Sequence, residues 1–138
     1  MDIDILMEFF DKIKKEIQDD LKLDRISLLD KQLTLPAIKH KWVSRLIEQK
    51  RSKNILQKKR KSLKEEVLKT LADNNIPMNI PKASLDKKVE SSDIIKKIDQ
   101  EIQDTELIID YLEKVESICR SMTFDIKNAV ELEKLETT

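Results

Sequence analysis

The sequence predicts an all-α fold of long antiparallel helices, and two features of its composition carry most of that prediction. None of its 138 residues is glycine, and 39% are charged. Average usage would give about ten glycines and only ~25% charged residues. The absence of glycine excludes the phosphate-binding loops of P-loop and Rossmann proteins, and it argues against a hairpin-rich β fold because tight turns favour glycine. Since apolar residues also recur at helical spacing, we expect a single helical domain over residues 1–138.

Residues 1–35 predict an N-terminal helix followed by a connector. Apolar residues recur every three or four positions, which is the spacing of a helix with one buried face. They are Ile5, Leu6, Phe9, Ile13, Ile17 and Leu21. Asp2 or Asp4 can cap the start of this helix. We expect residues 24–35 to form the connector to the next helix, with room for a short turn over residues 26–29.

Residues 36–73 predict a second, strongly basic helix. Pro36 suits a first helical turn, with Thr34 as its cap. At 100° per residue one seam of this helix is mainly apolar but includes three polar positions. The seam contains Trp42, Leu46, Gln49, Lys53, Leu56, Arg60, Leu63, Val67 and Leu71. We expect the helix to pack at both ends and to stay hydrated in the middle.

Residues 74–91 predict a loop, because two prolines and three asparagines fall within its first eight positions. A third, acidic helix is then expected over residues 92–138, with Ser91 or Ser92 as its cap. Its apolar residues again follow helical spacing, and residues 107–112 should be the most buried. The predicted core positions are Ile95, Ile98, Ile102, Ile109, Leu112, Val115, Cys119, Met122 and Ile126.

The C-terminal end of the acidic helix predicts self-association. Its apolar residues have little core of their own to fill, and soluble monomers avoid such exposed patches. We therefore expect a homo-oligomer whose contacts include Phe124, Ile126, Val130, Leu132 and Leu135.

The charge is unevenly distributed along a chain whose net charge is zero. Residues 36–71 hold twelve Lys and Arg against three acidic residues, whereas residues 90–138 hold thirteen acidic residues against six basic ones. Such asymmetry bears on partners rather than on fold. It favours a polyanion as the ligand of the basic helix.

The basic helix supplies the candidate nucleic-acid contacts. Lysines of one row fall within roughly 80° of arc and extend over about 38 Å, which suits a phosphate backbone. The candidates are Lys39, His40, Lys41, Arg45, Lys50, Arg51, Lys53, Lys58, Lys59, Arg60, Lys61 and Lys64. The alternative is that these charges pair with the acidic third helix. Trp42 could stack on a base, but its seam position favours core packing.

The sequence offers little for catalysis, so we expect a protein that is not an enzyme. It has one histidine and one cysteine, His40 and Cys119, which are 79 residues apart and spell out neither a metal site nor a nucleophile–base pair. Cys119 falls on the buried side of its helix. No metal or other cofactor is expected. No apolar run approaches a membrane span and the N-terminus is acidic, so we expect a cytoplasmic protein with no membrane contact.

Two motifs resemble the UvsY family of phage recombination mediators. The first is Lys39-His40-Lys41-Trp42 at the opening of the basic helix. The second is Asp110-Tyr111 followed fourteen residues later by Phe124-Asp125-Ile126-Lys127. The resemblance covers the second helix and the third from Asp93 to Glu133. Family members often end the basic helix with a Lys/Arg pair, an aromatic pair and a glycine, whereas here its bases lie a turn or two earlier.

The resemblance implies a small helical protein that forms a ring of about six or seven subunits and binds single-stranded DNA. It also implies partners: a RecA-like recombinase, UvsX, and the phage single-strand-binding protein. The protein would load the recombinase onto DNA coated by that binding protein, in an infected bacterial host. The alternative function is a helical scaffold or adaptor whose basic helix docks an acidic protein. Retention of a labelled oligonucleotide at moderate salt would separate the two.

Overall fold

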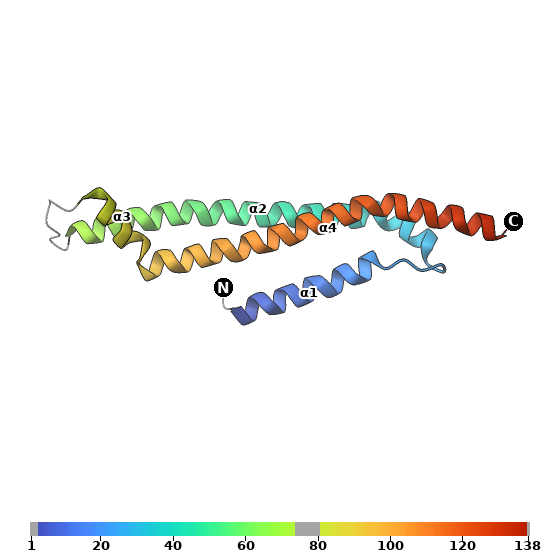
Figure 1. The fold of residues 1–138 in the computed structure, drawn as a ribbon, viewed down its shortest axis with the longest axis horizontal. Coiled ribbons are helices and arrows are strands. Elements are labelled where there is room, and N and C mark those ends of the chain that lie inside the picture. Colours follow the sequence, from blue (N-terminus) through green and yellow to red (C-terminus); the bar gives the residue numbers. More distant parts are fainter. Residues whose placement is uncertain (1–2, 74–80, 138) are drawn as a thin grey trace. The chain divides into compact units, whose positions relative to one another are not determined.

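The computed structural model describes residues 3–73 and 81–137, and the regular structure within these ranges is entirely α-helical (Figure 1). This confirms the predicted all-α class. The helices in chain order are α1 (Ile3–Leu21), α2 (Leu28–Asp73), α3 (Lys82–Glu90) and α4 (Asp93–Thr137). Across the described residues, no helix is both long and apolar enough to span a membrane.

The chain divides into two compact units. The α1 unit consists of residues 2–49 and 108–138, and the α3 unit consists of residues 50–107. Both α2 and α4 contribute to each unit, because the boundaries fall inside these two long helices.

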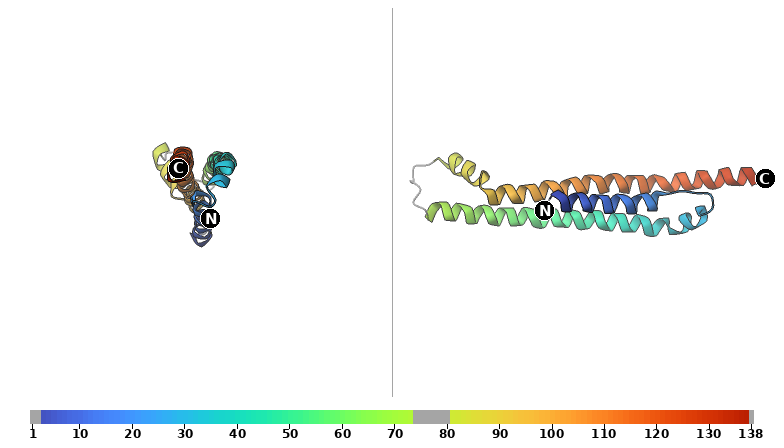
Figure 2. Two further views of the ribbon diagram at one scale, coloured as in Figure 1. Left: turned by 90° about the vertical axis from the view of Figure 1, so that its right-hand side faces the viewer. Right: turned by 90° about the horizontal axis from the view of Figure 1, so that it is seen from below.

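The α1 unit is a three-helix arrangement in which α1, coloured blue in Figure 2, packs against parts of α2 and α4. Its main core is a cluster of ten buried residues. These are Leu6, Ile13, Ile17, Trp42, Leu46, Ile108, Ile109, Leu112, Val115 and Cys119. A smaller cluster joins Leu28 and Leu35 of α2 to Met122 and Ile126 of α4.

The α3 unit has a thinner core. Val89 of α3 and Ile95, Ile98 and Ile102 of α4 are buried, while α2 contributes only half-buried side chains. Two ion pairs, Lys53–Glu106 and Arg60–Asp99, show that α2 and α4 run antiparallel here, because the residue number on α4 falls as that on α2 rises. Lys64 of α2 pairs with Glu90, the last residue of α3.

The helical periodicities of the sequence predicted both long helices well. All nine apolar positions expected in the core of α4 are buried. Every seam position of α2 is buried or half-buried, including the polar Gln49, Lys53 and Arg60. The expectation for residues 107–112 holds only in part, since Leu107 and Asp110 are exposed.

The predicted start of α2 is wrong, because the helix begins at Leu28 rather than at Pro36. The Asp24 carboxylate accepts hydrogen bonds from the backbone N–H groups of Ile26 (2.7 Å) and Ser27 (3.3 Å). These bonds lower the pKa of Asp24. The Ser27 carbonyl then accepts the first helical hydrogen bond, from the N–H of Lys31 at 2.9 Å. Asp24 and Ser27 therefore mark this helix start, although the sequence pattern had placed both residues in a connector.

Pro36 lies inside α2, and Thr34 is not its cap. The Thr34 hydroxyl instead donates to the carbonyl of Asp30 at 2.9 Å, one turn back in the same helix. Pro36 has no N–H for the carbonyl of Gln32. Both Pro36 and Gln32 are exposed, so water can satisfy that carbonyl and the helix continues.

The predicted loop over residues 74–91 is wrong for its second half, where α3 forms. Residues 74–80 lie outside the described part of the chain. Pro81 precedes α3, and its carbonyl accepts the N–H of Ser84 at 2.9 Å. Leu85 and the fully buried Val89 lie one turn apart on this nine-residue helix, too short a pattern to recognise in the sequence. Ser92 caps α4 as predicted, with its hydroxyl oxygen accepting the N–H of Ile95 at 3.4 Å.

Candidate nucleic-acid interface

Most candidate cations of α2 either pair with acidic residues of the chain or stay exposed. The division follows what packs beside each part of the helix. In the α1 unit the partners come from α1, and in the α3 unit they come from α3 and α4.

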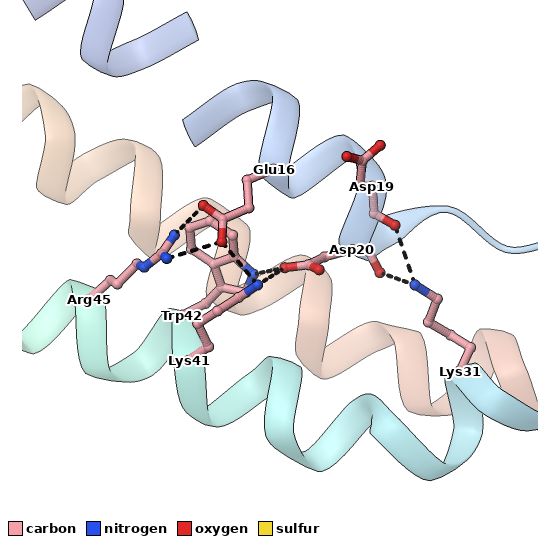
Figure 3. A network of polar contacts seen from close by, with 7 residues as sticks. All are labelled: Glu16, Asp19, Asp20, Lys31, Lys41, Trp42 and Arg45. Carbon is pink, nitrogen blue, oxygen red and sulfur yellow. Dashed lines mark hydrogen bonds and ion pairs between the residues drawn. The ribbon is translucent and has the colours of Figure 1, made fainter. Parts of the chain in front are cut away.

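In the α1 unit, Lys41 and Arg45 bind the acidic face of α1 (Figure 3). The Arg45 guanidinium donates to both oxygens of Glu16, at 2.7 Å and 3.0 Å. The Lys41 ammonium lies 2.5 Å from Asp20 Oδ2 and 3.2 Å from Glu16 Oε1. The Arg45 hydrogen bond is the main cause that lowers the pKa of Glu16, and the same bond raises the pKa of Arg45. These two cations therefore hold α1 against α2.

Trp42 lies at the centre of the same network and is fully buried. Its indole Nε1 donates to Asp20 Oδ2 at 2.8 Å. The Lys41 Nζ and Arg45 Cζ atoms lie 5.1 Å and 4.7 Å from its ring centroid, within cation–π range. Core packing, the favoured expectation for Trp42, is confirmed, and the ring is not presented for base stacking.

Three further side chains at this end of α2 differ in what they contact. Lys31 donates to the carbonyls of Asp19 (3.3 Å) and Asp20 (2.8 Å) and so caps the end of α1 (Figure 3). Lys39 donates to the Thr123 hydroxyl of α4 at 2.5 Å. His40 is exposed.

In the α3 unit, three cations that lie on or beside the buried seam of α2 pair with acidic residues. Arg60 donates to Asp99 Oδ1 and to Glu90 Oε2, each at 2.5 Å, and the Asp99 bond is the main cause that raises the pKa of Arg60. Lys53 lies 3.2 Å from Glu106, and Lys64 lies 3.7 Å from Glu90. Pairing with the acidic helix, the alternative considered from the sequence, thus accounts for these side chains.

The remaining candidates project into solvent. Lys50, Arg51, Lys58, Lys59 and Lys61 are exposed. Within the described ranges, all of these except Lys50 are without an ion pair.

One face of α2 in the α3 unit gathers most of these free cations, and we call it the outer face. Arg51, Lys58 and Lys61 fall within roughly 80° of arc, opposite the buried seam. Lys69 belongs to the same arc and is exposed, although it was not among the sequence candidates. Lys69 lies eleven residues after Lys58, and eleven residues of an α-helix bring a side chain back to within about 20° of the same direction. This spacing could have identified Lys69 from the sequence. Glu65 lies on this face as well.

The residues considered for a metal site or a nucleophile are the acidic side chains, His40 and Cys119. Within residues 3–73 and 81–137, no three His, Cys, Asp or Glu side chains are placed to hold a metal ion. Cys119 is 1% exposed, and burial raises the pKa of its thiol, which lowers the fraction of reactive thiolate.

The predicted oligomerisation residues are placed differently from one another. Ile126 is only 2% exposed and belongs to the chain's own core with Leu28 and Leu35. Val130 is half-buried against that cluster. Phe124, Leu132 and Leu135 are 69%, 61% and 73% exposed.

Comparison with known proteins gave one family and a set of solved structures. The family model described as "Recombination, repair and ssDNA binding protein UvsY" matches residues 3–138. No curated protein matches the chain.

The solved structures include three crystal forms of the bacteriophage T4 recombination mediator protein UvsY. Lattice type IV has a TM-score of 0.78 at 15% identity, covering 91% of this chain and 97% of that one. Type II has 0.75 at 16%, covering 93% and 97%, and type I has 0.74 at 16%, covering 91% and 98%. At identities this low, the TM-scores establish a shared fold and nothing more.

Proposed function

Because the chain belongs to the UvsY family of recombination, repair and single-stranded DNA binding proteins, we propose that it binds single-stranded DNA through the outer face of α2. The observation that carries this proposal is the set of exposed, unpaired cations Arg51, Lys58 and Lys61 on that face. Lys69 extends the set. In the cell, the protein would promote loading of the RecA-like recombinase UvsX onto DNA coated by the phage single-strand-binding protein.

Binding would be electrostatic and nearly independent of base sequence. Lysine and arginine side chains that meet phosphates release condensed counterions, and this release supplies the free energy of non-specific binding. Trp42 is buried and cannot read a base. Affinity should therefore fall steeply with salt, with a slope of log affinity against log salt near −0.7 per phosphate contact for single strands.

The direct test reverses the charge of the outer face. Arg51→Glu, Lys58→Glu and Lys61→Glu together change the local charge by six units without touching the buried seam. The matched control is Lys12→Glu, Lys14→Glu and Lys15→Glu on α1, where all three side chains are also exposed. Fluorescence anisotropy with labelled oligothymidine should show a loss of about a hundredfold or more for the outer-face variant, because attractive contacts become repulsive. The control should lose much less.

Equal losses in the two variants would mean that only net charge matters and that the outer face is not the site. Absence of any oligonucleotide binding by the unmodified protein would favour the alternative function, a helical adaptor that docks an acidic protein. Tight preference for one duplex sequence would also contradict the proposal.

We further propose a homo-oligomer of about six or seven subunits, with Leu132 and Leu135 covered by neighbouring copies. Both side chains are largely exposed in the single chain. Leu132→Ser with Leu135→Ser should lower the mass measured by light scattering towards that of the 16.2 kDa chain. Leu107→Ser is the control, since Leu107 is 55% exposed on the same helix. An unmodified protein that scatters as a single chain at micromolar concentration would refute this.

The mediator activity needs its own measurement. Assembly of a RecA-like recombinase on oligonucleotide coated by single-strand-binding protein should be faster with the unmodified protein than without it. The outer-face variant should give no acceleration, and the α1 control should still accelerate assembly. Acceleration by the outer-face variant would separate recombinase loading from DNA binding at this site.

A further inference from the structure

The α3 unit has a second feature that the outer face does not include, a hollow on one flank of the α2–α4 pair. It has a volume of about 290 Å³ and is lined by Lys59 and Leu63 of α2 and by Ile94, Lys97, Ile98 and Glu101 of α4. A neighbouring hollow of about 430 Å³, lined by Ser52, Ile55, Leu56 and Glu101, continues it along the helices.

Two helices each bring one free cation to the first hollow. Lys59 and Lys97 are both exposed, and neither forms an ion pair within the described part of the chain. This flank differs from the opposite one, where the cations of α2 are neutralised by Asp99 and Glu106 of α4. An anion entering here would meet two ammonium groups and one carboxylate, that of Glu101.

Apolar side chains lie beside the two cations. Ile94 is 54% exposed, on the side of α4 away from Asp99 and Glu106. Leu63 is half-buried and lines the same hollow. The site thus combines positive charge with an uncovered apolar surface, which is what a phosphate linked to a flat, weakly polar base requires.

We propose that this hollow is a nucleotide subsite for single-stranded DNA, with a backbone phosphate held by Lys59 and Lys97 and the attached base or sugar against Ile94. The inference rests on the proposed function and extends its interface from α2 to α4. The volume is near the lower end of the ~300–1,000 Å³ typical of small-molecule sites, which suits one nucleotide rather than a folded segment.

The test compares two neighbouring lysines of α4. Lys97→Gln removes a charge from the hollow, whereas Lys96→Gln removes the same charge from an exposed residue that does not line it. Lys96 points about 100° further round the helix. For labelled oligothymidine we expect Lys97→Gln to weaken binding about threefold to fivefold and to reduce the salt slope by about 0.7. Lys97→Arg should bind like the unmodified protein, and Lys96→Gln should be within twofold of it. Circular dichroism should show all three variants equally helical.

The apolar half of the subsite is tested with a matched ligand. The unmodified protein should prefer oligothymidine to an abasic oligomer of the same length, and Ile94→Ala should reduce that preference. If Ile94→Ala leaves the preference intact, the hollow holds phosphate alone and the nucleotide assignment is wrong.

The pattern across variants separates this inference from the function on which it rests. If the outer-face variant loses binding while Lys97→Gln and Lys96→Gln behave alike, the subsite is wrong and the proposed function stands. If the unmodified protein does not bind oligothymidine, both fail. If polyglutamate binds as tightly as oligothymidine and Lys97→Gln weakens both equally, the hollow is a docking site for an acidic protein segment and the nucleotide assignment is overturned.

Discussion

The two units of this protein use the same basic helix in different ways. In the α1 unit, a third helix covers α2 and its acidic residues engage Lys41, Trp42 and Arg45. Among the described residues of the α3 unit, no such third helix covers the outer face of α2, and Arg51, Lys58 and Lys61 are exposed. A cation of this helix is thus a structural element where an acidic residue of a neighbouring helix reaches it, and the proposed DNA contacts are the cations that none reaches.

The hydrophobic cores of the two units also differ, in how deeply their side chains are buried. Trp42 is fully buried among side chains of three helices, whereas Leu63 and its neighbours on α2 are only half-buried in the α3 unit. A buried aromatic side chain contributes both its apolar area and its hydrogen bond. The α1 unit should therefore account for more of the free energy of unfolding, while the α3 unit carries the proposed DNA-binding face.

The largest expected effect comes from removing the centre of the α1 unit. Trp42→Ala should lower the free energy of unfolding by about 3–5 kcal/mol, as for other large-to-small core substitutions. Leu63→Ala should cost only about 1–2 kcal/mol because its side chain is half-buried. Guanidinium unfolding followed by circular dichroism measures both. Trp42→Phe keeps most of the apolar area but loses the bond to Asp20, so its cost should fall between these values. Equal costs for Trp42→Ala and Leu63→Ala would remove the contrast between the two cores.

The sequence predicted the helical seams because they depend only on periodicity. The buried positions of α4 and the seam of α2 repeat every three or four residues over more than forty residues, so local exceptions do not obscure them. The start of α2 was missed because Pro36 is a stronger local signal than Asp24 and Ser27, and because an exposed proline is tolerated inside a long helix. The nine residues of α3 are too few to establish a period.

The division of the cations could not be predicted in the same way. Periodicity gives the angle of each side chain around its own helix, but not which neighbouring helix faces that angle. Arg45 meets Glu16 across 29 residues of sequence, and Arg60 meets Asp99 across 39. Such pairs depend on how the helices pack. Lys41 and Lys58 therefore looked alike in the sequence, but in the structure Lys41 pairs with Glu16 and Asp20 whereas Lys58 is exposed.

Neutralising two cations in the α1 unit should lower stability, whereas neutralising two in the α3 unit should lower affinity for DNA. Lys41→Gln with Arg45→Gln should lower the free energy of unfolding by about 1–2 kcal/mol, because part-buried charge-assisted hydrogen bonds are lost. Affinity of the folded protein for oligothymidine should change little. Lys58→Gln with Lys61→Gln should do the opposite, leaving stability within about 0.5 kcal/mol and reducing the salt slope by about 1.4.

The two double variants carry the same change in net charge, so each is the control for the other. A loss of affinity in Lys41→Gln with Arg45→Gln as large as that in the other pair would show that these cations reach DNA despite their bonds to α1. A loss of stability in Lys58→Gln with Lys61→Gln would show that the outer face has a structural partner.

The smallest expected effect is a pH dependence confined to the α1 unit. The Arg45 hydrogen bond lowers the pKa of Glu16 below its ordinary 4.5 in the folded chain. A carboxylate with a lowered folded pKa stabilises the fold above its unfolded pKa, and that contribution is lost as pH falls through the lowered value. Glu16→Gln should therefore be less stable than the unmodified protein at about pH 6, and the difference should shrink below the ordinary carboxylate range near pH 4. Trp42 is the only tryptophan in the chain, so its fluorescence during unfolding at each pH measures the effect in this unit. Asp24, whose pKa is also lowered, titrates in both proteins and cancels from the difference. A difference that stays constant down to the lowest pH would mean that the Glu16 charge contributes nothing to holding α1 in place.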